Sequence, residues 1–235
     1  MPEDILSSRR GFLVWSGTAC AGLFLSGCSR SKDEGSRDAG HSRKAVLSED
    51  ILCEHGVLQR SILIMEASVR RLDAHMGLPP EALPGAVEII QTYLEDFHQR
   101  KEEEEIFPYF EKAGKFNELI AVLRNQHQAG RRMTEIIQNL AASAIRDSEK
   151  RRKLDIAVNR FAYMYRVHTS REDTVLFPAL YQVVGPREYE KIAEDCRKRQ
   201  QQLLGENAFA RVIEKTLKIE ELLSIQDLET STPDF

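Results

Sequence analysis

The feature that most constrains this chain is a short segment that occurs twice, at residues 98–108 (HQRKEEEEIFP) and at residues 168–178 (HTSREDTVLFP). Both copies follow the pattern His-x3-Glu-x4-Phe-Pro. Residues four apart lie on the same face of an α-helix, so each copy would present an imidazole beside a carboxylate. These side chains are His98 with Glu102 and His168 with Glu172.

Each copy is preceded by one further histidine at a similar distance. His98 lies 43 residues after His55, and His168 lies 41 residues after His127. Two helical hairpins of similar length would give this spacing. An antiparallel four-helix bundle formed from them would direct all six side chains to a common centre. The pattern therefore predicts an all-α fold and a metal site with the ligands His55, His98, Glu102, His127, His168 and Glu172.

The chemistry of these side chains suits a site for two ions. Imidazole binds iron, zinc or copper, and carboxylates bind hard ions and can bridge two of them. Two irons about 3.5 Å apart could share both glutamates, with the histidines as terminal ligands. Burying two carboxylates without a metal or a cationic partner would be costly. Because no Lys or Arg is expected on the same inward face, a metal is the expected compensation.

The first 28 residues differ from the rest in having paired arginines, an apolar run and a cysteine. The run, residues 12–25, is shorter than the roughly 20 residues that cross a membrane as a helix. With Arg9 and Arg10 before it, the segment resembles a twin-arginine export signal. It ends in LSGC, which is similar to the lipobox of bacterial lipoproteins and implies cleavage before Cys28 and diacylation of its sulfur. The alternative is an uncleaved N-terminal anchor, and either one would tether the domain to a membrane outside the cytoplasm.

The remaining residues divide into a linker, one domain and a tail. Residues 29–44 are polar and charged without an apolar period, which predicts a flexible linker. Residues 45–225 are expected to form the metal-binding domain, and residues 226–235 a loose tail. Ser48, followed by two acidic residues, predicts the start of the first helix. Main helices are expected at about 48–76, 83–112, 116–145 and 148–185, with two more, separated by Gly205, packing on the outside of the bundle.

The charge balance and the cysteine spacing argue against two other kinds of function. The chain has 33 Lys and Arg against 37 Asp and Glu, a net charge of −4, so nucleic-acid binding is not expected. Cys53 and Cys196 lack Cys-x2-Cys spacing, so a thiolate zinc site is not expected either.

These residues resemble the hemerythrin-like family, which carries the HHE cation-binding domain. The resemblance covers about residues 45–225. It implies a non-haem di-iron site, with manganese or zinc as alternative metals, that binds dioxygen, nitric oxide or peroxide through the six residues named above. It rests on Glu54-His55, His98 with Lys101-Glu102-Glu103 and Phe107-Pro108, His127 with Gly130-Arg131, and His168 with Glu172-Asp173 and Leu176-Phe177-Pro178.

One position departs from the pattern of oxygen-carrying hemerythrins. Those proteins have a further histidine four residues after the third-helix ligand, where this chain has Arg131, which does not bind metals at neutral pH. One iron would therefore keep an additional open or water-filled position. This difference argues against a simple oxygen carrier and favours sensing, reactive chemistry or iron handling.

Four further side chains lie close to the predicted ligands in the sequence. Glu105, seven residues after His98, is either a partly exposed acid or a carboxylate beside the metals. Tyr165 either packs in the core or donates a hydrogen bond to a bound ligand. Glu103 and Glu104 are expected in solvent.

The leading interpretation is a membrane-tethered binding protein for a small diatomic molecule or peroxide. The sequence has no flavin motif, electron-transfer domain or resolving cysteine pair, which favours binding over turnover. The alternatives are a di-iron enzyme that reduces peroxide or nitric oxide, ferritin-like iron oxidation, and a metal-free structural lipoprotein. Ferritin-like sites need Glu-x2-His on two helices, and this chain has it once, from Glu95 to His98.

Overall fold

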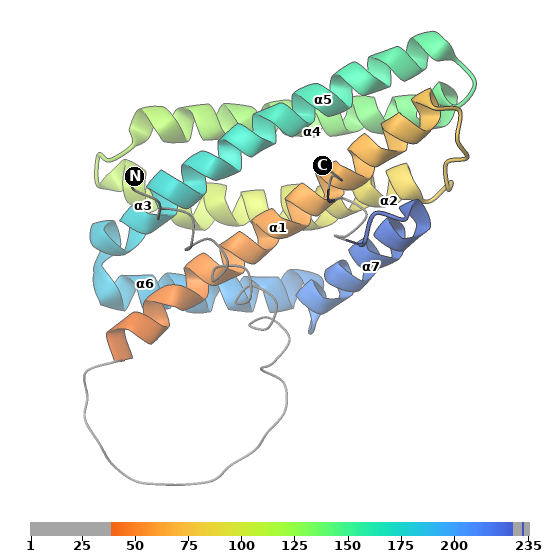
Figure 1. Ribbon diagram of the computed structural model, residues 1–235. Helices are drawn as coiled ribbons and strands as arrows, with labels where there is room; N and C mark the ends of the chain where they lie inside the picture. Colours follow the sequence, from red (N-terminus) through yellow and green to blue (C-terminus); the bar gives the residue numbers. More distant parts are fainter. Residues whose placement is uncertain (1–38, 228–231, 233–235) are drawn as a thin grey trace, which may run out of the picture. The chain divides into compact units, whose positions relative to one another are not determined.

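The computed structural model describes residues 39–227 and residue 232, with side chains from Leu47 onwards. Every secondary-structure element in this part of the chain is helical (Figure 1), which confirms the predicted all-α fold. The predicted export signal with Cys28, residues 29–38 of the linker, and residues 228–231 and 233–235 of the tail lie outside the described residues. No helix among the described residues is long and apolar enough to cross a membrane.

Four antiparallel rods form the bundle (Figure 1). The first rod is α1 (Ala39–Asp73), and the third is α4 (Asn117–Ala144). The second and fourth rods each contain π-helical turns. The second consists of α2 (Ala82–Ile89), η1 (Ile90–Gln99), η2 (Glu102–Ile106) and α3 (Phe107–Lys112). The fourth consists of α5 (Ser148–Arg171), η3 (Glu172–Leu176) and the first part of α6 (Phe177–Leu204).

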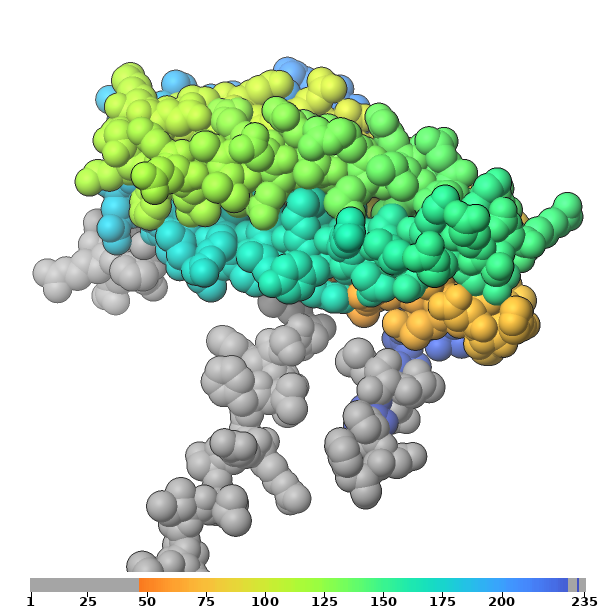
Figure 2. Space-filling view, turned by 90° about the horizontal axis from the view of Figure 1, so that it is seen from above, coloured from red at the N-terminus to blue at the C-terminus, as the bar shows by residue number. Residues whose placement is uncertain are grey.

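Adjacent rods pack pairwise into a closed square. The first rod contacts the second rod and α5, and α4 contacts the same two neighbours. Figure 2 shows the face formed by α4 and α5, where the side chains of the two helices make a continuous surface. This arrangement is the antiparallel four-helix bundle that the duplicated spacing predicts.

Local sequence signals fix several helix ends. The Asp147 side chain caps α5 by accepting hydrogen bonds from the backbone N–H groups of Glu149 and Lys150, at 3.0 and 3.1 Å. Gly185, with φ 77°, breaks the helical path inside α6 immediately before Pro186. The fourth rod therefore ends where the sequence predicts, and the chain continues in a new direction.

The start of the first helix differs from the prediction. Helix α1 begins at Ala39, inside the segment 29–44 that was predicted to be a flexible linker. Ser48 is consequently not an N-cap. Its Oγ lies 3.0 Å from Tyr189 Oη, so the hydroxyl joins α1 to α6 instead of capping a helix.

The C-terminal helices pack on the outside of the bundle as predicted. The part of α6 after Gly185 lies along α1, and α7 (Ala208–Leu223) lies against α1 and α2 (Figure 1). Two buried residues of α7, Ile219 and Leu223, join the hydrophobic core. Arg60 on α1 and Glu220 on α7 add a two-pronged ion pair, with N–O distances of 2.8 and 2.5 Å.

Two hydrophobic clusters fill the bundle, one on each side of a layer of polar side chains. On α1, Ile51 belongs to one cluster and Leu58 to the other, with His55 between them. In each of the other three rods the predicted ligands likewise lie between residues of one cluster and residues of the other. The polar layer contains the six predicted ligands, His55, His98, Glu102, His127, His168 and Glu172.

Candidate metal centre

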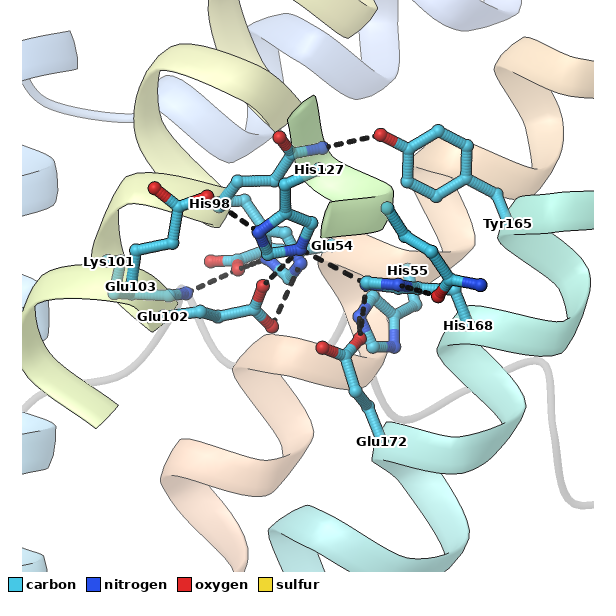
Figure 3. Close-up of polar contacts among 12 residues, drawn as sticks. Glu54, His55, His98, Lys101, Glu102, Glu103, His127, Tyr165, His168 and Glu172 are labelled. Carbon is cyan, nitrogen blue, oxygen red and sulfur yellow. Dashed lines mark hydrogen bonds and ion pairs between the residues drawn. The ribbon is translucent and has the colours of Figure 1, made fainter. Parts of the chain in front are cut away.

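The structure brings the six predicted ligands together in the polar layer (Figure 3). None of these residues is more than 3% exposed. Their donor atoms form two groups, within each of which one atom from every residue lies within 4.8 Å of the others. The first set is His55, His98 and Glu102. The second set is Glu102, His127, His168 and Glu172.

Each glutamate lies between two histidines from different rods. Glu102 is 3.2 Å from His98 Nε2 through Oε1 and 3.4 Å from His127 Nε2 through Oε2. Glu172 Oε2 lies 3.4 Å from His55 Nε2 and 3.1 Å from His168 Nε2. Each carboxylate therefore connects one copy of the repeat to the other.

The Nδ1 atoms of the four histidines all have partners on the outer side. These are Asp173 for His55 (2.7 Å), Glu54 for His98 (2.5 Å), Glu103 for His127 (2.8 Å) and Gln126 for His168 (3.0 Å). Carboxylate and amide oxygens are acceptors, so a neutral imidazole donates from Nδ1 and keeps the lone pair of Nε2 directed inward. This outer hydrogen bond is the usual way in which proteins orient a metal-binding histidine.

Most of the inward-facing atoms lack hydrogen-bond partners, although His127 Nε2 and His168 Nε2 lie 3.1 Å from each other. Within the described part of the chain, none of the four carboxylate oxygens of Glu102 and Glu172 has a hydrogen-bond partner, although all are buried. His55 Nε2 is in the same state. Buried polar atoms are nearly always paired in proteins, and lone pairs that face one another repel. Imidazole and carboxylate are suitable ligands for iron, manganese or zinc, so the cluster fits divalent cations.

Two π-helical turns place the glutamates. In η2 the backbone N–H of Phe107 donates to the carbonyl of Glu102, and in η3 Phe177 donates to Glu172 in the same way. Each hydrogen bond spans five residues instead of four, which defines a π turn. The repeated Glu-x4-Phe-Pro pattern is therefore the sequence of a π turn that ends at a helix-initiating proline.

Lys101 contradicts the prediction that no cation lies on the inward face. It is only 1% exposed, and its ammonium group pairs with Glu54 (Figure 3). A sequence signal existed, because Lys101 follows His98 by three residues and so shares its side of the helix. Because Lys101 pairs with Glu54, neither Glu102 nor Glu172 has a lysine or arginine as a hydrogen-bond partner among the described residues.

Glu103 is also placed differently from the prediction. It is not free in solvent but lies between His127 Nδ1 and Arg131 Nη2, at 2.8 and 3.2 Å. Arg131 thus reaches the site through Glu103.

Two other predicted residues make polar contacts with neighbouring side chains. Glu105 points to α6, where its carboxylate accepts from Arg199 at 2.7 Å and from Cys196 Sγ at 3.3 Å. The structure does not bring Glu105 together with the six. Tyr165 is buried, its ring contacts that of His168 edge to face, and its Oη accepts from Gln99 Nε2 at 2.8 Å.

The surroundings shift the pKa values of several groups in the cluster. Burial and the nearby charge of Glu172 raise the pKa of Glu102 well above its ordinary value. Burial opposes the charged form of His55, but Asp173 and Glu172 raise its pKa to about 10. Burial lowers the pKa of His98 to about 4 and keeps this ring neutral. Protons at Glu102 and His55 would have to leave when cations bind, so protons and metal ions compete for the centre.

The fold and the site together define a class of protein, the helical bundle with a buried histidine and carboxylate cluster that could hold metal ions. The family model of the hemerythrin HHE cation binding domain matches residues 46–180. The chain belongs to this family, whose domains bind metal cations, typically iron, and take small ligands through the metal.

Two mycobacterial proteins are similar to almost the whole chain. An uncharacterized protein of Mycobacterium tuberculosis (strain ATCC 25618 / H37Rv) is 37% identical over 231 residues, which cover 96% of this chain and 91% of the relative. An uncharacterized protein of Mycobacterium bovis (strain ATCC BAA-935 / AF2122/97) matches with the same identity and coverage. No solved structure matches this chain.

Proposed function

We propose that this protein is a non-haem di-iron protein. The proposed ligands are His55, His98, Glu102, His127, His168 and Glu172. The proposal rests on the buried carboxylate oxygens of Glu102 and Glu172. These oxygens have no hydrogen-bond partner among the described side chains, and they face the Nε2 atoms of the histidines. Two bound cations would satisfy these atoms at once, with Glu102 shared between them.

Loading with iron tests the ligand assignment. Glu102→Ala or Glu172→Ala should lower the iron content sharply, because each removes a buried carboxylate that faces two histidines. The matched control is Glu104→Ala, which changes an exposed glutamate of the same acidic run that pairs with Arg199. Metal analysis after desalting gives the stoichiometry. An unchanged iron content in either variant would remove that glutamate from the ligand set.

The proposed ligand of the centre is dioxygen, nitric oxide or peroxide, bound for sensing, scavenging or a response to iron or redox stress. A pair of irons supplies coordination positions and electrons for such molecules. Arg131, at the position of the additional histidine of oxygen carriers, is engaged with Glu103, which supports an open position at one iron. Optical and Mössbauer spectra with and without oxygen and nitric oxide test this. Catalytic removal of peroxide or nitric oxide with an electron donor would favour an enzyme instead.

The proposed location is outside the cytoplasm, on a lipid anchor at Cys28 that follows a twin-arginine export signal. The support is in the sequence, namely the paired arginines, the short apolar run and the LSGC segment. Cys28→Ala should move the protein from the membrane fraction to the soluble fraction, because a thioether-linked diacylglycerol supplies most of such an anchor. Fractionation followed by immunoblotting measures this. Persistent membrane association of the variant would contradict the anchor.

A further inference from the structure

A buried ion pair lies directly behind His98. Lys101 Nζ donates to Glu54 Oε2, the same oxygen that accepts from His98 Nδ1 at 2.5 Å (Figure 3). The side chains of Lys101 and Glu54 are only 2% and 4% exposed. Lys101 Nζ also lies 5.0 Å from the centre of the Phe97 ring. A charged lysine is strongly destabilised away from water unless it is paired, so this placement ties Lys101 to Glu54.

A second arrangement of the same kind lies behind His127. Glu103 Oε1 accepts from His127 Nδ1 at 2.8 Å and from Arg131 Nη2 at 3.2 Å. This pair is closer to solvent, since the side chains of Arg131 and Glu103 are 32% and 21% exposed. In both arrangements one carboxylate oxygen contacts a cation and a histidine at the same time.

The two arrangements belong to different parts of the centre. His98 is in the first set of donors, and His127 is in the second. The other histidine of the first set, His55, contacts Asp173, and that of the second, His168, contacts the neutral amide of Gln126. Each set therefore contains one histidine whose outer carboxylate is paired with a cation.

We propose that Lys101 and Glu54 are positioning residues that fix His98 for the ion of the first set, and that Arg131 and Glu103 do the same, more weakly, for His127 in the second set. The inference rests on the proposed di-iron function. A carboxylate held by a cation cannot easily rotate away from the imidazole, so the ring keeps its Nδ1 hydrogen and its Nε2 stays directed at the ion. The buried pair acts where water is excluded, which strengthens its hold on the ring.

Paired substitutions test the inference without leaving a buried charge alone. Glu54→Gln or Lys101→Met by itself leaves a buried charge unpaired and can unfold the domain, whereas replacing both partners is far better tolerated. The first variant is therefore Glu54→Gln with Lys101→Met. The second, Glu103→Gln with Arg131→Met, changes the other arrangement. The control, Glu149→Gln with Lys153→Met, removes an exposed ion pair on α5.

Each protein is loaded with ⁵⁷Fe, challenged with increasing chelator and examined by metal analysis, Mössbauer spectroscopy and circular dichroism. Wild-type protein and the control should hold two ions. The first variant should keep its helical spectrum but bind one ion roughly 10–100-fold more weakly, with loss of one of the two iron signals. The second variant should lose the other signal, with a smaller change in affinity.

Two results would overturn the positioning role while leaving the di-iron function intact. One is unchanged affinity for both ions in the first variant. The other is an equal loss of both ions, which a general structural defect would produce. Wild-type protein that binds no metal would refute the proposed function itself, together with this inference.

Discussion

Gly130 and Tyr165 pack so closely that a residue with a side chain does not fit at position 130. A Cβ on Gly130 would lie 1.9 Å from Tyr165 Oη and 2.7 Å from Cζ of the same ring. Tyr165 has little room to move, because it is buried and its ring lies against that of His168. The glycine one helical turn after His127 thus makes room for the Tyr165 ring next to the polar layer.

Gly130→Ala should lower the free energy of unfolding by about 1–3 kcal/mol, because a rigid buried ring must be displaced. The matched control is Gly56→Ala, a helical position with open space around the new methyl group, where alanine should stabilise by up to about 1 kcal/mol. Urea unfolding measures both. Equal midpoints for Gly130→Ala and the wild type would show that Tyr165 can shift freely.

Single residues of the site could be predicted from the sequence to different degrees. The six donors follow from the duplicated spacing, because an interval of four residues fixes a shared helix face. The partners of their Nδ1 atoms come from other helices or from the π turns, so spacing alone gives no distance to them. Glu103 and Glu105 illustrate this, because an α-helical projection predicts neither the contact of Glu103 with His127 nor the turn of Glu105 towards Arg199.

At the scale of elements, the π turn is the feature that α-helical periodicity misses. A wider turn rotates every following residue relative to an α-helix, and η2 and η3 both begin at a predicted ligand. The repeated Phe-Pro indicates a change near a helix end, because proline cannot continue the hydrogen bonding of an α-helix, but it does not predict a π turn. The start of α1 was missed for a related reason, because a good capping sequence at Ser48 does not prevent a helix from continuing through it.

The N-cap of α5 is an element-scale device that can be tested separately from the site. Asp147→Ala removes both hydrogen bonds to the first turn and should lower the free energy of unfolding by roughly 0.5–2 kcal/mol. The adjacent exposed Ser148→Ala is the matched control and should have a much smaller effect. Iron content should be unchanged in both. A loss of iron in folded Asp147→Ala would mean that the cap also influences the centre.

At the scale of the whole molecule, the bundle and its antiparallel order were predictable because the repeat imposes them. Two copies of one hairpin pattern bury their apolar faces most simply by packing against each other. The sequence predicts that α7 packs on the outside of the bundle, but it does not predict that α7 contacts α1 and α2. Its exact position depends on Ile219, whose Cδ1 would lie 2.7 Å from a Cβ at Gly85.

Ile219→Ala should lower the free energy of unfolding by about 2–4 kcal/mol, since Ile219 is buried between α7 and the bundle. Leu222→Ala, on the exposed side of the same helix, is the matched control and should change stability little. Thermal or urea unfolding measures the difference. Similar losses in the two variants would contradict the observed orientation of α7.

The polar layer between two apolar clusters has a consequence for assembly. Each cluster can form from its own ends of the four rods, but the two meet across buried carboxylates and imidazoles, whose charges are balanced by protons or by bound cations. Cations bound there would link all four rods at the middle of the bundle, because the donors come from every rod. Cations that replace those protons would add their binding free energy to the stability of the fold, so the amount of intact protein would rise with the supply of metal.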